Sequence, residues 1–295
     1  MRTVHHWTDT TATIQVEGLS QSLRVMHVTD SHIALIDERD SAYIEACRGR
    51  CELFSSLRKD GGGTPISVET SFAETVSNAK AASVDLLALT GDIVDFPSKA
   101  SIEAASAPLM AAKIPFVYTA GNHDWLFAGL TPSDTLRRDA WPALAPFHRG
   151  DAAYSKRDIH GVRFIAVDNS NYQVNGEQLE FARANLAEGM PSVLLIHIPI
   201  SLPTLRAPTI ECWKAPILTG DPDWKPESRT QWHTRADEVE TLEFINLAAA
   251  STNLIAVLCG HIHFPHADNL RPGAIQYVGQ PGYAGGYRMI EIQPL

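Results

Sequence analysis

Residues 86–95 read Leu-Leu-Ala-Leu-Thr-Gly-Asp-Ile-Val-Asp, an apolar run that ends in two carboxylates. Four more apolar runs end in residue types that bind metals: 25–29 before Asp30 and His32, 116–120 before Asn122, 193–196 before His197, and 254–259 before His261 and His263. Short, wholly apolar runs predict strands that are buried on both faces. Because ligand sites of open α/β sheets lie beyond the carboxyl ends of such strands, one sheet could deliver all five clusters to one edge.

The polar side chains after these runs form one set of candidate ligands. Its seven members are Asp30, His32, Asp92, Asn122, His197, His261 and His263. They offer oxygen and imidazole donors but no thiolate, a mixture that suits Mn, Fe or Zn better than Ca. Seven ligands are too many for one tetrahedral ion and suit two metal ions that share a carboxylate, roughly 3.5–4 Å apart. We therefore expect two divalent or trivalent transition-metal ions as cofactors.

Glycines stand directly before three of the candidate ligands, at Gly91, Gly121 and Gly260. A residue without Cβ lets the chain turn sharply and brings the backbone close to its neighbours. This placement predicts tight turns between each strand and the cluster that follows it.

The composition is that of an ordinary globular protein. The 295 residues are 44% hydrophobic and 20% charged, with a formal charge of −10. An acidic chain does not favour polyanions, so a nucleic acid polymer is not an expected partner. Four scattered cysteines indicate free thiols, and neither a signal-like start nor an apolar run of about 18 residues is present. These features predict a cytoplasmic protein with no membrane association.

Strand and helix patterns alternate along the first half of the chain, as in a layered α/β domain. Residues 1–295 are expected to form one domain that carries an irregular insertion at about 199–233, near the active site. The expected strands are 11–17, 23–29, 152–157, 161–167 and the region after 264. The expected helices are 40–58, 67–82, 98–112, one that starts at Asn175 and Gln178, and one that Thr234 could cap and that ends near 250. Ser71 and Glu74 are spaced as a capping box near the start of the helix 67–82.

Five blocks in order carry a family resemblance: Asp30-x-His32, Gly91-Asp92-x-x-Asp95, Gly121-Asn122-His123-Asp124, His197 and Gly260-His261-x-His263. Together they look like the calcineurin-like metallophosphoesterase family, over about residues 24 to 264, with the bacterial phosphodiesterase-like branch as the nearest in layout. Asp95 stands where purple acid phosphatases carry a tyrosine. The arginine-rich continuation of the serine/threonine phosphatases is absent as well.

This resemblance implies an α/β fold, a four-layer α/β/β/α sandwich of two mixed β-sheets flanked by helices. It implies that Asp92 bridges two metal ions. One ion would be held by Asp30, His32, Asp92 and His263, and the other by Asp92, Asn122, His197 and His261. His123 matches the histidine that assists the leaving oxygen, and Asp95 matches the acid that orients it. Asp124 completes the third block and could simply support its loop.

The implied function is hydrolysis of a small-molecule phosphoester, and most readily a phosphodiester, by attack of a metal-bridging hydroxide. A phosphomonoesterase is the alternative, and a catalytically silent metal-binding scaffold is a remote one. Besides Asn122, the expected substrate contacts are Trp125, Phe96 and His233, although aromatic side chains more often serve packing alone. Trp213, Trp224 and Trp232 are weaker candidates of the same kind, and Asp168-Asn169-Ser170 is expected to be a structural turn. The native metals, the substrate and the oligomeric state stay open.

Overall fold

The computed structural model describes residues 1–148 and 150–295 and contains two six-stranded mixed sheets. The first sheet has the order β1-β2-β14-β3-β6-β7 and the second the order β12-β13-β11-β10-β9-β8. Strands of the first sheet are β1 (Thr3–Trp7), β2 (Thr11–Val16), β3 (Leu23–Val28), β6 (Leu86–Leu89), β7 (Phe116–Tyr118) and β14 (Arg288–Pro294). Strands of the second are β8 (Tyr154–Ile159), β9 (Val162–Val167), β10 (Ser192–Leu195), β11 (Leu254–Cys259), β12 (His266–Arg271) and β13 (Ala274–Val278).

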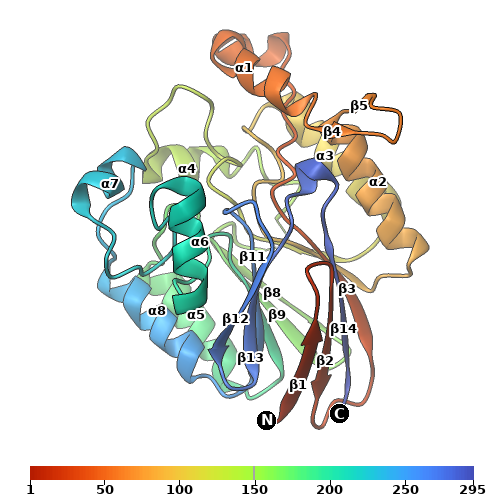
Figure 1. Ribbon diagram of the computed structural model, residues 1–295, viewed down its shortest axis with the longest axis vertical. Coiled ribbons are helices and arrows are strands. Elements are labelled where there is room, and N and C mark those ends of the chain that lie inside the picture. The colour runs from red at the N-terminus through yellow and green to blue at the C-terminus, as the bar shows by residue number, and fades with distance from the viewer. Residues whose placement is uncertain (149) are drawn as a thin grey trace.

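Helices cover the outer face of each sheet, so the molecule has four layers (Figure 1). The helices are α1 (Ile44–Phe54), α2 (Val68–Ala81), α3 (Lys99–Ala112), α4 (Asp134–Ala140), α5 (Gly176–Ala187), α6 (Pro203–Trp213), α7 (Pro226–Gln231) and α8 (Val239–Ala250). Two 3-10 turns, η1 (Glu38–Tyr43) and η2 (Gly282–Ala284), and a small hairpin of β4 (Arg58–Lys59) and β5 (Pro65–Ile66) complete the fold.

Three apolar cores correspond to the three interfaces between layers. Val25, Leu86 and Val117 of the first sheet pack against Phe164 and Leu195 of the second. The outer face of the first sheet packs against α2 and α3, and the outer face of the second against α5, α6 and α8. The expected four-layer sandwich is confirmed. The central strands β6, β7 and β11 are apolar throughout because both faces of the sheets are buried at their positions.

The five apolar runs all become strands, but they belong to two sheets instead of one. β3 pairs in parallel with β6, and β6 in parallel with β7. In the facing sheet, β10 pairs in parallel with β11. The carboxyl ends of three strands from one sheet and two from the other therefore meet at the same end of the sandwich, which α1 overhangs in Figure 1.

Several local predictions need correction. The segment 199–233 is not wholly irregular, since α6 and α7 lie within it. Pro203 and Pro226 stand at the starts of these helices. Pro208 inside α6 weakened the helical periodicity of the sequence there. Ser67 caps α2, whereas Ser71 is buried inside it. The last long helix starts after Glu238, beyond Thr234. The expected helix 40–58 splits into η1 and the shorter α1, and β1 and α4 were not anticipated.

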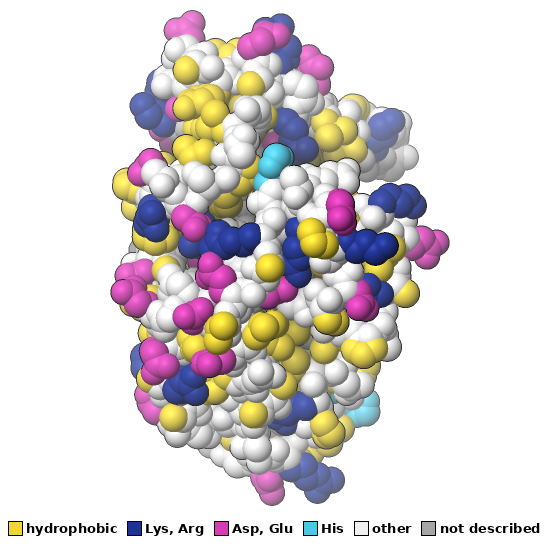
Figure 2. Space-filling view, turned by 90° about the vertical axis from the view of Figure 1, so that its left-hand side faces the viewer, with side chains coloured by type: hydrophobic (Ala, Val, Ile, Leu, Met, Phe, Trp, Pro, Cys, Tyr) yellow, Lys and Arg dark blue, Asp and Glu magenta, His cyan; other side chains and the backbone are white. Residues whose placement is uncertain are grey.

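The surface carries charges of both signs. Figure 2 looks onto the side that carries α7 and shows acidic and basic side chains interspersed across that face. Among the residues that the structure describes, no helix combines the length and apolar character needed to cross a bilayer.

Candidate metal centre and active site

Four of the candidate ligands converge from three strand ends. Asp30 and His32 follow β3, Asp92 follows β6 and His263 follows β11. One donor atom from each of the four lies within 4.8 Å of the others. The Nε2 atoms of His32 and His263 are 3.1 Å apart, and Nε2 of His263 is 3.4 Å from Oδ1 of Asp30. Asp30, His32 and Asp92 are almost fully buried, so this group faces inward from both sheets.

A second group lies beside the first and shares Asp92 with it. Nε2 of His197 is 3.2 Å from Oδ2 of Asp92 and 3.2 Å from Oδ1 of Asn122. Nδ1 of His261 is 2.9 Å from the same Asn122 oxygen. Oδ2 of Asp92 also lies 3.6 Å from Nε2 of His32, which belongs to the first group. One carboxylate oxygen therefore faces both groups.

The outward ring nitrogens of three of these histidines have fixed partners. Nδ1 of His32 bonds Oδ1 of Asp95 at 2.7 Å, and Nδ1 of His197 donates to the carbonyl of Thr90 at 2.7 Å. Nε2 of His261 is 2.9 Å from the hydroxyl of Tyr172. A proton held on the outward nitrogen leaves the inward nitrogen with a free lone pair, the arrangement that ligand histidines need. The inward nitrogens of these three histidines are then acceptors, like the carboxylate and amide oxygens beside them, and this set of atoms fits bound cations.

The ionisation of the cluster is strongly perturbed. Burial alone would raise the pKa of Asp30, but the neighbouring His263 lowers it to about 2. Burial alone would lower the pKa of His197, but Asp92 and its hydrogen bond raise it to about 9. The pKa of Asp92 lies well below its ordinary value because the histidines around it outweigh its burial. Such mutual shifts in a buried cluster are typical of functional sites.

The backbone at the strand ends is strained. Five of the seven candidate ligands have positive φ angles: Asp30 at 50°, His32 at 45°, Asp92 at 50°, His261 at 72° and His263 at 59°. Residues with a Cβ rarely adopt this left-handed conformation, and it tends to persist where a site requires it. These left-handed residues redirect the chain at the strand ends, so that the five side chains face the space between the sheets.

The predicted tight turns are present at the glycines. A Cβ on Gly121 would overlap the backbone nitrogen and side chain of Asp92, and a Cβ on Gly260 would overlap Thr29 and Asp30. Gly91 combines a φ of 86° with close approach to Gly121. Only glycine allows these loops to pack so closely around the candidate ligands.

Asp95 has a different main partner from the one expected. Its Oδ1 accepts from His32 at 2.7 Å, while Nδ1 of His123 is 3.5 Å away, too far for a strong hydrogen bond. The guanidinium of Arg50 also bonds both oxygens of Asp95. These partners lower the pKa of Asp95 although burial opposes the shift.

Asp124 supports its loop, the role that the sequence analysis offered for it. Its carboxylate accepts from the backbone N–H groups of Asp92, Val94 and Gly121 at 2.7–2.9 Å. These bonds tie the second and third sequence blocks together and fix the backbone of Asp92.

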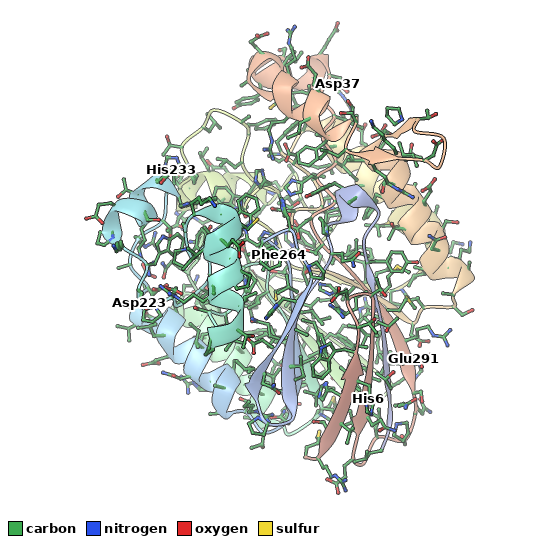
Figure 3. The ribbon with its side chains drawn as sticks, in the orientation of Figure 1. His6, Asp37, Asp223, His233, Phe264 and Glu291 are labelled. Carbon is green, nitrogen blue, oxygen red and sulfur yellow. The ribbon has the colours of Figure 1, made fainter. Side chains whose placement is uncertain are left out.

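A cavity of about 400 Å³ adjoins the second group of ligands. Asn122 and His261 open onto it, and Trp125, Tyr172, Trp232 and His233 form part of its wall. Figure 3 shows His233 just beyond α7, at the end of the segment 199–233. Of the expected substrate contacts, Asn122, Trp125 and His233 therefore line one space beside the candidate metal centre.

Phe96 does not reach this cavity, so its expected substrate contact is wrong. Its side chain has no exposed surface and packs with Cys47, Phe54 and Val68 under α1. Trp224 is likewise buried in the core of the second sheet, and Trp213 lies edge-on to His263 with ring centroids 5.4 Å apart.

Three residues of the site were not among the site residues that the sequence predicted. Arg50 and Tyr172 contact the candidate ligands or their partners, as described above. Asn169, in the expected structural turn, accepts from the backbone N–H groups of His197 and Ile198 at 2.9 and 3.0 Å and thereby fixes the loop of His197. Such residues contribute one contact each from loops or helices of ordinary composition, and spacing alone does not distinguish them.

Comparison with known proteins agrees with this geometry. Residues 23–265 match the family described as calcineurin-like phosphoesterase. A relative from Synechococcus sp., named "Probable cyclic nucleotide phosphodiesterase", is 27% identical over 240 residues, which cover 75% of this chain and 77% of the relative.

Two solved structures share the fold. A dimetal phosphatase from Danio rerio superimposes with a TM-score of 0.53 at 12% identity, covering 90% of this chain and 91% of the other. The purple acid phosphatase PPD1 from yellow lupin seeds gives 0.54 at 13% identity, covering 93% of this chain and 46% of the lupin chain.

The chain belongs to the calcineurin-like phosphoesterase family. Membership confirms the expected resemblance and the expected enzyme class, a metal-dependent phosphoric ester hydrolase. It also implies two bound metal ions, in keeping with the two ligand groups that meet at Asp92.

Proposed function

We propose that this protein hydrolyses a small organic phosphodiester at a dinuclear metal centre. The observation that carries the proposal is the position of Asp92, whose Oδ2 faces His197 at 3.2 Å and His32 at 3.6 Å. A carboxylate oxygen shared in this way fits the bridging ligand of a two-metal site.

The seven candidate ligands divide between two ions. Asp30, His32, Asp92 and His263 would hold one, and Asp92, Asn122, His197 and His261 the other. Mixed oxygen and imidazole donors favour Mn, Fe or Zn. Bound there, two such ions would polarise phosphoryl oxygens and lower the pKa of a coordinated water molecule.

The chain itself supplies the remaining functions. Asp124 and Gly121 fix the loop that carries Asn122 and His123. His123, whose backbone N–H donates to Asp92 at 2.8 Å, stands beside the ligand groups and would face the leaving oxygen. Its role would be to stabilise the charge that develops on that oxygen.

The adjoining cavity supports a diester over a monoester. A phosphodiester carries one organic group more than a monoester, and a largely apolar space of about 400 Å³ beside the centre could hold it. Trp232 and His233 line this space, and the largely buried Trp125 closes one part of its wall. Since the Synechococcus relative is named as a cyclic nucleotide phosphodiesterase, cyclic nucleotides are candidates beside glycerophosphodiesters.

Initial rates test this proposal. Metal-free protein is reloaded with Mn²⁺ and assayed on bis(p-nitrophenyl) phosphate and on p-nitrophenyl phosphate, with Asp92→Asn as the inactive control. A higher kcat/KM on the diester is the expected result, and cyclic nucleotides and glycerophosphodiesters would be assayed next. A preference for the monoester would contradict the proposal and indicate a phosphatase. Two bound metals without activity on either ester would point to a scaffold.

The site of action would be a reducing compartment such as the cytoplasm. Cys47, Cys51, Cys212 and Cys259 are all free, and none is paired as a disulfide. Free thiols are usual in reducing compartments.

A further inference from the structure

Helix α1 brings two side chains to the active site from outside the five sequence blocks. Arg50 reaches Asp95, with its Nε 2.8 Å from Oδ2 and its Nη2 bonded to Oδ1. Phe54 stacks on His32 with ring centroids 4.8 Å apart and planes 5° from parallel. The guanidinium of Arg50 lies 5.0 Å from the centre of the Phe54 ring, so the two side chains make a cation–π contact.

Because Asp95 already accepts hydrogen bonds from Arg50 and His32, it is not well placed to accept another from His123. Oδ1 of Asp95 already accepts from His32 at 2.7 Å as well as from Arg50. Nδ1 of His123 lies 3.5 Å from that oxygen but 3.4 Å from Nη2 of Arg50, with the N–H directed at the ring nitrogen. Of these two neighbours, the guanidinium makes the hydrogen bond to Nδ1 of His123, a long one at 3.4 Å.

A guanidinium is a donor only, so Nδ1 of His123 has to accept. A neutral imidazole that accepts at Nδ1 carries its proton on Nε2. We propose that Arg50 is a positioning residue, which fixes His123 in the Nε2–H tautomer and, through Asp95, holds the ring of His32 in place.

The proposal rests on the proposed function and makes it more specific. With its proton on Nε2, His123 donates a hydrogen bond to the leaving oxygen and stabilises the negative charge there. The proton stays on the ring, and the departing oxygen takes a proton from water. Had the carboxylate of Asp95 accepted from Nδ1–H, the ring would have presented a lone pair to the leaving oxygen unless it were protonated.

Nitrogen-15 spectra of histidine-labelled, metal-free protein test the tautomer without any assay of activity. The His123 resonances are assigned by their loss in His123→Gln. The expected wild-type pattern is the Nε2–H tautomer, and Arg50→Met should convert it to a mixture. An Nδ1–H pattern in the wild type would overturn the proposal, and it does so even if Arg50→Met fails to fold.

Arg48 provides a matched control on the same helix. Its side chain is 61% exposed and pairs with Glu45 at 2.7 Å, away from Asp95. Arg48→Met should leave the His123 pattern unchanged. A change of tautomer in Arg48→Met equal to that in Arg50→Met would show a general effect of α1 and would overturn the specific role of Arg50.

A double-mutant cycle tests whether Arg50 acts through His123. On a diester with a poor leaving group, Arg50→Met is expected to lower kcat on the order of tenfold, the scale of one charge-assisted hydrogen bond, with little change in KM. In a His123→Ala background it should have no further effect. A full loss in that background, or a loss confined to KM, would overturn the proposal. Inactive wild type would instead refute the proposed function and leave the spectroscopic result standing.

Discussion

The hydroxyl of Tyr172 lies 2.9 Å from Nε2 of His261, on the side of the ring away from Asn122. Tyr172 adopts a φ of 69°, so the backbone is strained to hold this side chain there. The contact leaves Nδ1 of His261 free to act as a ligand. Tyr172, which lies outside the sequence motifs, thus favours the tautomer in which His261 can bind a metal, and it also lines the adjoining cavity.

Tyr172→Phe is expected to weaken the second metal site. Loss of a partner to a ligand histidine typically costs about 10–100-fold in metal affinity. Competition with a chelator, read by elemental analysis, measures the affinity. Tyr154→Phe on edge strand β8, where the ring stacks on Phe181, is the control that should bind metal normally. Unchanged affinity in Tyr172→Phe would show that the hydroxyl does not position His261.

Asp92→Asn should reduce binding at both sites together. An amide retains the shape but loses the charge that faces both ligand groups, whereas a change at Asp30 alone should weaken mainly one site. The expected stoichiometry falls below two ions per chain under conditions that saturate the wild type. Retention of two ions with wild-type affinity would contradict the shared position of Asp92.

Gly121→Ala tests the close packing of the turn. The added Cβ would overlap Asp92, so we expect a loss of metal affinity and a destabilisation of about 1–3 kcal/mol, the usual cost of overpacking. Gly176→Ala is the matched control, because nothing lies within 4 Å of a Cβ at that position. Equal thermal stability and metal binding in the two variants would show that the turn can relax.

His27 makes stability depend on pH. Burial between the sheets and the nearby Arg288 lower the pKa of His27 from 6.5 to about 3. The folded state therefore prefers the neutral ring, and this contribution is complete above pH 6.5 and is lost as the pH falls toward 3. Each extra proton bound by the unfolded state gives a slope of up to about 1.4 kcal/mol per pH unit.

His27→Gln should therefore flatten the decline of unfolding free energy between pH 6.5 and 4 in denaturant titrations. His6→Gln changes an exposed residue of β1 and should leave the slope unchanged. A wild-type slope in His27→Gln would mean that other groups account for the acid sensitivity.

His123→Ala should lower kcat on a diester with a poor leaving group by about 10²–10⁴-fold, the usual range for a group that assists proton or charge movement. A nitrophenolate leaves readily and needs less help, so the loss on bis(p-nitrophenyl) phosphate should be smaller. Steady-state rates at saturating Mn²⁺ measure both. Equal losses of kcat on the two esters would show that His123 does not act on the leaving oxygen.

Much of the architecture could be predicted from the sequence. Apolar runs with no alternation identify strands buried on both faces, and ligand residues directly after them predict a site at the strand ends. The capping box of Asn175 and Gln178 correctly marked the start of α5, because both of its hydrogen bonds are local. The division of the runs between two sheets came from the family resemblance, since strand pairing depends on distant contacts.

Other features depend on tertiary contacts that no local pattern encodes. Arg50 lies in α1, within the helix expected at 40–58, but only the fold brings its side chain against Asp95. Phe96 follows a ligand block in sequence, yet its side chain turns into the core under α1. The helices α6 and α7 begin at prolines in a segment rich in tryptophan and charge, so the periodic signal there was lost.

A titration of metal-free protein with Mn²⁺ tests the dinuclear centre most directly, with bound metal and diester hydrolysis followed in the same samples. The account predicts that hydrolysis of bis(p-nitrophenyl) phosphate rises to a plateau as two ions bind per chain. It also predicts that Asp92→Asn neither reaches that stoichiometry nor gains the activity. Full activity with a single bound ion, or equal activity in the metal-free protein, would contradict it.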